Sequence, residues 1–342
     1  MHYAEEIGIL GAGAWGTALA RHFSLKYGKA RFWAIEKEVA DAIQTRHVNP
    51  LYLPEIMLPE GLVATNDLQA FADGLTLLVV VVPSHVLRTV VSQLSVWLKK
   101  DIPIICATKG IEIETWMTMD EVLTSVLGPD TPNRLAILSG PSFAFDVARG
   151  KATAVSLASC NDALCAVLQR CVSNEAFRAY TTPDVIGVEL GGALKNVIAI
   201  AAGAASGLEL GNNAVAALVT RGLAEMTRLC VKRGGEALTL SGLSGLGDLA
   251  LTCYGTLSRN RELGFKLGRG VSFDEIQRSR ITVAEGVRTA AGAYALAKQC
   301  GVDMPITQRV YEGLYEGKPP ATVLSELMGR DLKRELEFSC RT

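Results

Sequence analysis

The first half of the chain alternates between short apolar runs and amphipathic segments. The apolar runs are rich in β-branched residues and predict strands buried on both faces, whereas the amphipathic segments predict helices. The predicted strands lie at residues 7–10, 30–35, 61–65, 75–82, 102–107 and 135–139, and the predicted helices at 14–26, 37–47, 67–72 and 84–98. Strands that alternate with helices in this way predict a parallel, doubly wound α/β sheet with helices on both faces.

The pattern changes to helix alone beyond residue 182. Before that point, residues 152–157 and 177–180, with a helix at 162–171 between them, are expected to extend the sheet, and the three prolines in 49–59 favour an ordered loop. The later helices are predicted at 184–206, 214–233, 247–253, 259–267, 273–279, 285–299, 306–312 and 321–327. We therefore predict two domains, residues 1–185 with the sheet and residues 186–342 with helices.

A glycine motif follows the first predicted strand. Gly11, Gly13 and Gly16 form Gly-x-Gly-x-x-Gly, and the next predicted strand ends beside an acid, Glu36. In a Rossmann-type domain these glycines allow the tight turn, the approach of a pyrophosphate and close packing of the helix, while the acid binds a ribose hydroxyl. The first domain is therefore predicted to bind a dinucleotide, with an ordinary glycine turn as the alternative.

The composition excludes several other classes of protein. The chain of 342 residues is 49% hydrophobic with a net charge of -1, so it has no general attraction for nucleic acid or anionic membranes. Its eight cysteines include no Cys-x-x-Cys pair, so we interpret them as reduced thiols and predict no metal site. The apolar runs are too short to span a bilayer and no signal peptide is recognisable, which predicts a cytoplasmic protein.

Ligands of a doubly wound sheet bind where its parallel strands end. Besides the glycine motif and Glu36, the segments at these ends are Val82-Pro83-Ser84, Thr108-Lys109-Gly110 and Gly140-Pro141-Ser142. Lys109 is therefore expected at the ligand edge, with a solvated lysine in a turn as the alternative.

Lys195 lies on the long helix that begins the second predicted domain. The neighbouring positions on its helix face are glycine and alanine, so another element is expected to pack closely there. Burial lowers the pKa of a lysine and suits it to acid–base chemistry. The alternative is a lysine whose ammonium reaches solvent from a buried helix.

Two more segments of the second predicted domain carry candidate ligands. Asp248 stands among glycines that suggest a close approach of the backbone, with a helix N-cap as the alternative. Ser258, Arg259 and Asn260 open a helical pattern and would form a phosphate site at its N-terminus, with a plain capped helix as the alternative. We assign no role to the four scattered histidines.

Together these motifs resemble the bacterial-type NAD(P)-dependent glycerol-3-phosphate dehydrogenase family over nearly the whole chain. The matching segments are residues 11–20, 52–54, 82–84, 108–110, 139–143, 189–196, 245–249 and 258–261. The resemblance implies a Rossmann-type domain followed by an all-α domain of the 6-phosphogluconate dehydrogenase C-terminal-like type. It implies reduction of dihydroxyacetone phosphate to sn-glycerol 3-phosphate, which supplies glycerophospholipid synthesis, and it suggests a homodimer.

The resemblance also implies roles for single residues, with Lys195 as the catalytic acid–base. The substrate would be bound by Lys109, Gly140, Ser142, Lys195, Asp248, Ser258, Arg259 and Asn260. The cofactor would be bound by Gly11, Gly13, Ala14, Trp15, Gly16, Glu36, Lys109, Ala144, Arg259, Val283 and Glu285. A cationic acid suits this reaction, because hydride transfer to a ketone builds negative charge on its oxygen.

The end of the second predicted strand departs from many relatives, which have a basic or polar residue in place of Ile35 and Asp in place of Glu36. A carboxylate favours the free 2′-hydroxyl of NAD(H), whereas Lys37 or Arg46 would suit the 2′-phosphate of NADP(H), so we expect use of both coenzymes. Two other functions are alternatives: a hydroxyacid dehydrogenase of the 6-phosphogluconate or β-hydroxyacid type, and a non-catalytic protein that senses NAD(H).

Overall fold

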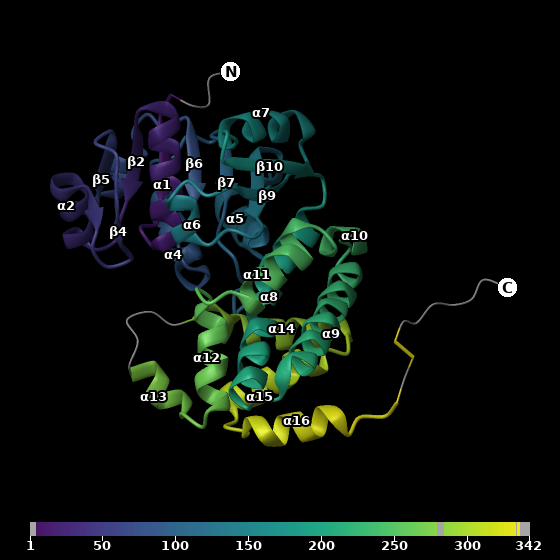
Figure 1. Ribbon diagram of the computed structural model, residues 1–342. Helices are drawn as coiled ribbons and strands as arrows, with labels where there is room; N and C mark the ends of the chain where they lie inside the picture. The colour runs from purple at the N-terminus through teal and green to yellow at the C-terminus, as the bar shows by residue number, and fades with distance from the viewer. Residues whose placement is uncertain (1–4, 279–283, 333, 336–342) are drawn as a thin grey trace.

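The computed structural model describes residues 5–278, 284–332 and 334–335. Within these ranges the chain up to Thr182 forms an eight-stranded sheet with helices on both faces, and the elements that follow are helical (Figure 1). Figure 1 shows the sheet and its helices in the upper half of the view and the helical part below it. The predicted fold class is therefore confirmed.

The order of the strands places the first strand near the middle of the sheet. From one edge to the other they are β10 (Phe177–Thr182), β9 (Thr153–Ala158), β8 (Leu135–Ser139), β7 (Ile104–Cys106), β6 (Leu77–Val80), β1 (Ile7–Leu10), β2 (Ala30–Trp33) and β5 (Leu62–Thr65). The chain leaves β1 in one direction along the sheet towards β2 and later in the other towards β6. This reversal makes the end of β1 a topological switch point, where open α/β sheets bind ligands.

The helices fall into two groups, one that packs on the sheet and one that forms the second part. The first group is α1 (Ala14–Tyr27), α2 (Lys37–Arg46), α3 (Leu68–Ala72), α4 (Ser84–Ser95), α5 (Met119–Leu127), α6 (Ala144–Ala148) and α7 (Asp162–Val172). The second is α8 (Val185–Gly207), α9 (Gly211–Lys232), α10 (Ala237–Leu240), α11 (Asp248–Tyr254), α12 (Arg259–Gly268), α13 (Phe273–Arg278), α14 (Glu285–Cys300), α15 (Pro305–Tyr315) and α16 (Pro320–Met328). The short helices α5, α6 and α10 were not predicted from the sequence.

The strands predicted up to residue 139 all pair in parallel, and two details of this region differ from the expectations. The sheet is mixed rather than parallel, because β9 pairs antiparallel with β8, with Leu138 opposite Leu157. The segment between these strands holds only the short helix α6, and an antiparallel neighbour needs no long crossover. The segment 49–59 is not a loop throughout, since β3 (Val48–Asn49) and β4 (Leu53–Met57) pair antiparallel there.

Alternating residues of each central strand fill two separate cores. On β6, Leu77 and Val79 belong to one cluster of buried side chains, whereas Leu78 and Val80 belong to the cluster on the opposite face. This arrangement follows from the two-residue period of a strand and explains the continuous apolar run in the sequence. A third buried cluster lies among the helices of the second part.

Helix α8 runs through the centre of this third cluster. Among the described residues it is the one helix long and apolar enough to cross a membrane, but 83% of its most apolar stretch is buried inside the fold. Its apolar composition is therefore that of a core helix. Figure 1 shows α8 beginning beside the sheet and passing down among the helices, so residues along it lie close to the edge where the parallel strands end.

Candidate active site

A cavity of about 690 Å³ is lined by residues of both parts of the molecule. From the sheet side come the start of α1, the loop before β4, and the segments after β6, β7 and β8, and from the helical side come α8, α11, α12 and the start of α14. The sheet contributes to this cavity through the carboxyl ends of its parallel strands, as the doubly wound topology requires.

The glycine loop leads to the start of α1, whose residues Ala14 and Trp15 line the cavity. Gly11 has a φ of +118°, which only glycine adopts readily, and a Cβ at Gly16 would lie 1.8 Å from the carbonyl oxygen of Gly11. Gly13 is the N-cap of α1, where no side chain caps the helix and where a Cβ would meet nothing within 4 Å. The N–H groups at the start of α1 are therefore open to an anion.

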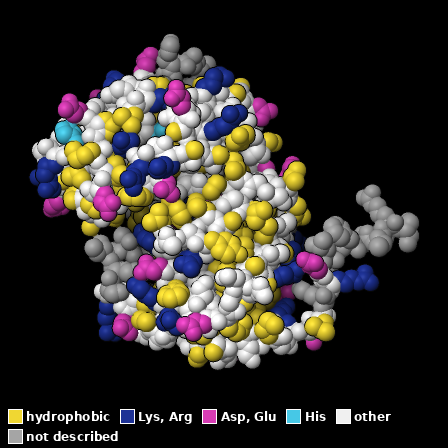
Figure 2. Space-filling view, viewed as in Figure 1, with side chains coloured by type: hydrophobic (Ala, Val, Ile, Leu, Met, Phe, Trp, Pro, Cys, Tyr) yellow, Lys and Arg dark blue, Asp and Glu magenta, His cyan; other side chains and the backbone are white. Residues whose placement is uncertain are grey.

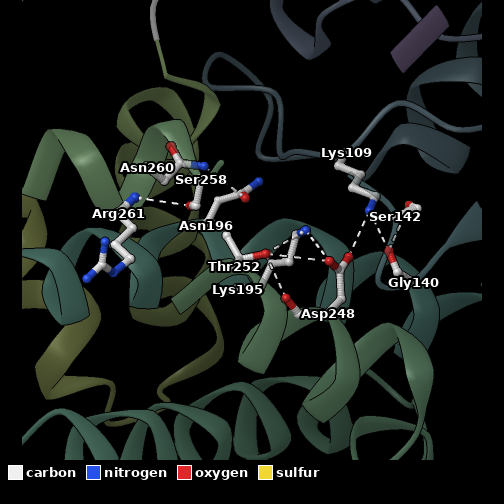
Figure 3. Close-up of polar contacts among 10 residues, drawn as sticks. All are labelled: Lys109, Gly140, Ser142, Lys195, Asn196, Asp248, Thr252, Ser258, Asn260 and Arg261. Atoms are coloured by element: carbon white, nitrogen blue, oxygen red, sulfur yellow. Dashed lines mark hydrogen bonds and ion pairs between the residues drawn. The ribbon is translucent and has the colours of Figure 1, made fainter. Parts of the chain in front are cut away.

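Lys195 lies on α8 in the wall of this cavity and is only 8% exposed. Its ammonium donates hydrogen bonds to Oδ1 of Asp248 and to Oγ1 of Thr252, the latter at 3.0 Å (Figure 3). Burial lowers the pKa of Lys195 to about 8, although the charge of Asp248 opposes this shift; Lys109 adds to the lowering. The alternative of an ammonium that reaches open solvent is not what the structure shows.

Asp248 lies between two lysines. Its Oδ2 accepts a hydrogen bond from Nζ of Lys109 at 2.8 Å while Oδ1 accepts from Lys195, and the carboxylate is 1% exposed. The three side chains carry one net positive charge beside the cavity. Figure 2 shows basic and acidic side chains interspersed over the visible face, so attraction for an anion depends on such local groups.

Glycines bring the backbone of α12 against α8. A Cβ at Gly203 would lie 2.0 Å from the carbonyl oxygen of Arg261, and one at Gly264 would lie 1.9 Å from that of Ile200. This is the close packing predicted for the face that carries Lys195. On the turn before α11, the carbonyl oxygen of Ser244 would lie 2.5 Å from a Cβ at Gly191, so the glycine-rich turn also approaches α8 closely and carries Asp248 to Lys195.

The start of α12 brings three candidate phosphate ligands to the cavity. Ser258 is the N-cap, and its Oγ accepts from the backbone N–H of Arg261 at 3.2 Å. Asn260 donates from Nδ2 to Oδ1 of Asn196 at 2.9 Å and accepts at Oδ1 from the N–H of Gly286 at 3.0 Å. The amide of Asn260 therefore joins α12 to α8 and α14, which leaves one of its N–H groups for a ligand.

The structure gathers most of the candidate residues around one space. Those that line the cavity are Ala14, Trp15, Lys109, Ser142, Ala144, Lys195, Ser258, Arg259, Asn260 and Glu285. Gly140 lies behind it, and its carbonyl oxygen accepts from Oγ of Ser142 at 2.9 Å and from Nζ of Lys109 at 3.4 Å. Gly11, Gly13, Gly16, Glu36 and Asp248 are not part of the lining, and Val283 lies outside the described residues.

Two polar residues of the site were missed by reasoning from the sequence. Thr252 holds the Lys195 ammonium, and Asn196 holds Asn260. Thr252 lies one helical turn after Asp248, a spacing that places both on one face of α11. Asn196 stands directly after Lys195, in a segment quoted above without a separate role.

Cysteines and acids form no metal site in the ranges that the structure describes. No group of three or more His, Cys, Asp or Glu side chains there is arranged to hold a metal ion. The seven described cysteines are free thiols; five are buried, whereas Cys160 is exposed and Cys300 half-buried. Cys340 lies outside the described residues.

The family models and the most similar known proteins all indicate the same family. The model described as NAD-dependent glycerol-3-phosphate dehydrogenase N-terminus matches residues 6–165, and the corresponding C-terminus model matches residues 184–325. The chain is 49% identical over 332 residues to glycerol-3-phosphate dehydrogenase [NAD(P)+] of Geobacter sulfurreducens, covering 97% of this chain and 99% of that protein. It is 48% identical over 328 residues to the enzyme of that name from Myxococcus xanthus, covering 96% and 98%.

Solved structures agree with this match. The crystal structure of glycerol-3-phosphate dehydrogenase from Coxiella burnetii superposes with a TM-score of 0.90 at 42% identity, covering 95% of this chain and 99% of that chain. A ketopantoate reductase family structure from Ralstonia eutropha JMP134 superposes with a TM-score of 0.62 at 14% identity, covering 93% and 99%. The second likeness concerns the fold alone.

Proposed function

The chain belongs to the NAD-dependent glycerol-3-phosphate dehydrogenase family and is an NAD(P)-dependent enzyme that reduces dihydroxyacetone phosphate to glycerol 3-phosphate, and we propose that Lys195 is its catalytic acid–base. The observation that carries this proposal is the cluster of Lys195 and Lys109, which line the cavity, around the buried carboxylate of Asp248 behind them. It supplies a proton donor in a fixed position with excess positive charge around it.

Lys195 exchanges the proton of the reaction. The nicotinamide coenzyme, when bound, supplies the hydride that reaches C2 of the ketone. The oxygen on C2 then gains negative charge, which an ammonium within hydrogen-bond reach stabilises and neutralises by proton transfer. Because the pKa of Lys195 is about 8, the side chain is protonated at neutral pH and still gives up its proton more readily than an ordinary lysine.

Asp248 and Thr252 orient the ammonium of Lys195, and Lys109 binds the other oxygen of the Asp248 carboxylate. Asp248 uses one oxygen for each lysine, so it holds both ammonium groups at one end of the cavity. We propose that Lys109, Gly140 and Ser142 contact the substrate there, and that Lys109 also contacts the cofactor. A fixed donor is more effective than a mobile one, because the catalytic geometry is formed before the substrate arrives.

The start of α12 is proposed to bind the phosphate of the substrate. Arg259 lines the cavity, and its guanidinium would hold a phosphate through two parallel hydrogen bonds. The hydroxyl proton of Ser258 and the remaining amide N–H of Asn260 are available as further donors. Phosphate bound at this end positions the ketone over Lys195, so that binding energy remote from the reacting carbon contributes to catalysis.

The cofactor is assigned to the sheet side of the cavity. The residues proposed to bind it are Gly11, Gly13, Ala14, Trp15, Gly16, Glu36, Lys109, Ala144, Arg259, Val283 and Glu285. In this arrangement residues 1–185 form the dinucleotide-binding domain and residues 186–342 the substrate-binding domain. We further propose that the enzyme uses both NAD(H) and NADP(H), is cytoplasmic, forms a homodimer and supplies glycerophospholipid synthesis.

The role of Lys195 is tested by removing its ammonium while keeping its length. Lys195→Met retains the aliphatic stem, and we expect it to lose turnover with dihydroxyacetone phosphate while NADH binds with unchanged affinity. Turnover is measured by NADH oxidation, and affinity by the fluorescence of the bound nicotinamide. Lys151→Met, at an exposed position outside the cavity, is the matched control. Wild-type turnover in Lys195→Met would exclude the proposed role.

A further inference from the structure

A chain of hydrogen bonds connects the glycine loop with Glu36. Asn49, which is fully buried, donates from Nδ2 to the carbonyl oxygen of Ala12 and to Oγ1 of Thr17, both at 2.8 Å. Its Oδ1 accepts from the backbone N–H of Tyr52 at 3.1 Å. The hydroxyl of Tyr52 in turn donates to Oε1 of Glu36 at 2.7 Å. The position of Glu36 is thereby fixed relative to the glycine loop.

Glu36 is not used by the helix that it begins. It is the N-cap residue of α2, where a carboxylate commonly accepts N–H groups of the first turn, yet its side chain makes no such bond. The carboxylate is turned towards Tyr52 instead, and within the part of the chain that the structure describes no second donor is bound to it. Its Oε2 is therefore available to a ligand at the end of β2.

We propose that Tyr52 determines the coenzyme preference by holding Glu36 in position to accept the free 2′-hydroxyl of the adenosine ribose of NAD(H). The same fixed carboxylate repels the 2′-phosphate of NADP(H) and shifts the preference towards NAD(H). Tyr52 acts here through Glu36 and is a positioning residue. This inference rests on the dinucleotide site proposed above and adds the residue that sets its selectivity.

The surroundings of Tyr52 keep its hydroxyl protonated, so that it can always donate a hydrogen bond to Glu36. Burial, followed by the hydrogen bond and the charge of Glu36, raises the pKa of Tyr52 to about 12. Its hydroxyl therefore keeps its proton at physiological pH. Its backbone is held by Asn49, so it cannot move away without disturbing the glycine loop. A carboxylate held in this way has little freedom to rotate away from an approaching phosphate.

The residues near Glu36 determine which coenzyme is favoured once the hydrogen bond from Tyr52 is removed. Ile35 is 67% exposed and offers no charge to a 2′-phosphate, whereas Lys37 and Arg46 on α2 are exposed cations. Once Glu36 is released, its repulsion of the phosphate weakens and these two cations remain. Loss of the Tyr52 hydroxyl should therefore weaken the binding of NADH and spare or improve that of NADPH.

The test is a double-mutant cycle on coenzyme affinity. Dissociation constants of NADH and NADPH are measured by nicotinamide fluorescence for the wild type, Tyr52→Phe, Glu36→Gln and the double variant. We expect the wild type to bind NADH more tightly than NADPH and Tyr52→Phe to reduce this ratio about tenfold, as expected for one charge-assisted hydrogen bond. In the Glu36→Gln background, Tyr52→Phe should leave the ratio unchanged.

Phenylalanine keeps the ring of Tyr52, and the thermal midpoint verifies that each variant is folded. Tyr180→Phe on β10, at an exposed tyrosine outside the cavity, is the control and should not alter either affinity. Three results would overturn the inference: a wild type that prefers NADPH, a ratio that is unchanged in folded Tyr52→Phe (as when both affinities fall equally), or an effect of Tyr52→Phe that persists without the Glu36 charge. A wild type that binds neither coenzyme would instead refute the dinucleotide site.

Discussion

Lys195 and Asp248 form a buried ion pair that joins helices α8 and α11 beside the cavity, with side chains that are 10% and 1% exposed. The pair has two opposing effects on the lysine. Burial favours the neutral amine and the carboxylate favours the ammonium, and burial is the stronger effect. The result is a lysine whose proton is bound at neutral pH and released in mildly alkaline solution, which suits a reversible dehydrogenase.

This balance predicts opposite pH profiles for the two directions of the reaction. Reduction of dihydroxyacetone phosphate needs the ammonium, so its kcat/KM should fall as the pH rises through about 8. Oxidation of glycerol 3-phosphate needs the free amine, so its kcat/KM should rise through the same region. Both profiles are measured between pH 6 and 10 with saturating coenzyme. A profile that titrates only near the ordinary lysine value would show that Lys195 is not the group responsible.

Removing the negative charge of Asp248 should impair both its lysine partners. Asp248→Asn retains one oxygen acceptor but leaves Lys109 and Lys195 close together with no anion between them. Because the charge of Asp248 raises the pKa of Lys195, the alkaline limb of the reduction profile should move to lower pH. We also expect kcat at pH 7 to fall by about two orders of magnitude, within the usual range for a displaced general acid.

The control for Asp248→Asn is another ion pair outside the cavity. Glu209 pairs with Arg269 at 2.6 Å, and its side chain is 72% exposed. Glu209→Gln should leave kcat, the pH profile and the free energy of unfolding unchanged to within about 0.5 kcal/mol. If Asp248→Asn behaves in the same way, the carboxylate between the two lysines has no part in the reaction.

Arg259 allows the phosphate assignment to be tested separately from the chemistry. Arg259→Ala should raise KM for dihydroxyacetone phosphate by two to three orders of magnitude, which corresponds to about 3–4 kcal/mol for a lost bidentate contact. Dihydroxyacetone, which lacks the phosphate, serves as the comparison substrate. The wild type and Arg259→Ala should reduce it at the same slow rate. Arg269→Ala, at the opposite end of α12, is the matched variant. If Arg259→Ala lost kcat/KM equally with dihydroxyacetone phosphate and dihydroxyacetone, Arg259 would not bind the phosphate.

Much of this arrangement could be predicted because it depends on local patterns. The apolar runs predict the strands of the sheet, and the small residues around Lys195 predict the close approach that α12 makes. The ends of the strands predict that Lys109 and Ser142 lie at the edge where ligands of such a sheet bind, and both line the cavity. In each case the information lies in residue size and spacing along a single element.

The remaining features depend on contacts between distant segments. Nothing near Asp248 indicates that it lies between two lysines, one 53 and the other 139 residues away along the chain. The antiparallel pairing of β9 with β8 depends on how the chain returns to the sheet, which the hydrophobic pattern does not encode. Asn49, hidden in a proline-rich segment that resembles a loop, connects the glycine loop to Tyr52 through tertiary hydrogen bonds.

The glycine loop offers a pair of variants that separates folding from coenzyme binding. At Gly16 a methyl group would lie 1.8 Å from the carbonyl oxygen of Gly11, so the backbone must shift. Gly16→Ala should therefore lower the free energy of unfolding by about 1–3 kcal/mol, the usual effect of overpacking. At Gly13 the backbone has φ -64° and ψ 176°, which alanine adopts without strain, and a methyl group would meet nothing within 4 Å.

Gly13→Ala should consequently keep wild-type stability in urea unfolding but lose affinity for NADH, because its methyl group fills the space through which a pyrophosphate approaches the start of α1. Urea unfolding should therefore reveal the effect of Gly16→Ala, and NADH affinity should reveal the effect of Gly13→Ala. Wild-type NADH affinity in Gly13→Ala would place the pyrophosphate elsewhere. Wild-type stability in Gly16→Ala would mean that the turn after β1 moves away from the helix without cost, and the close packing seen there would not constrain the loop.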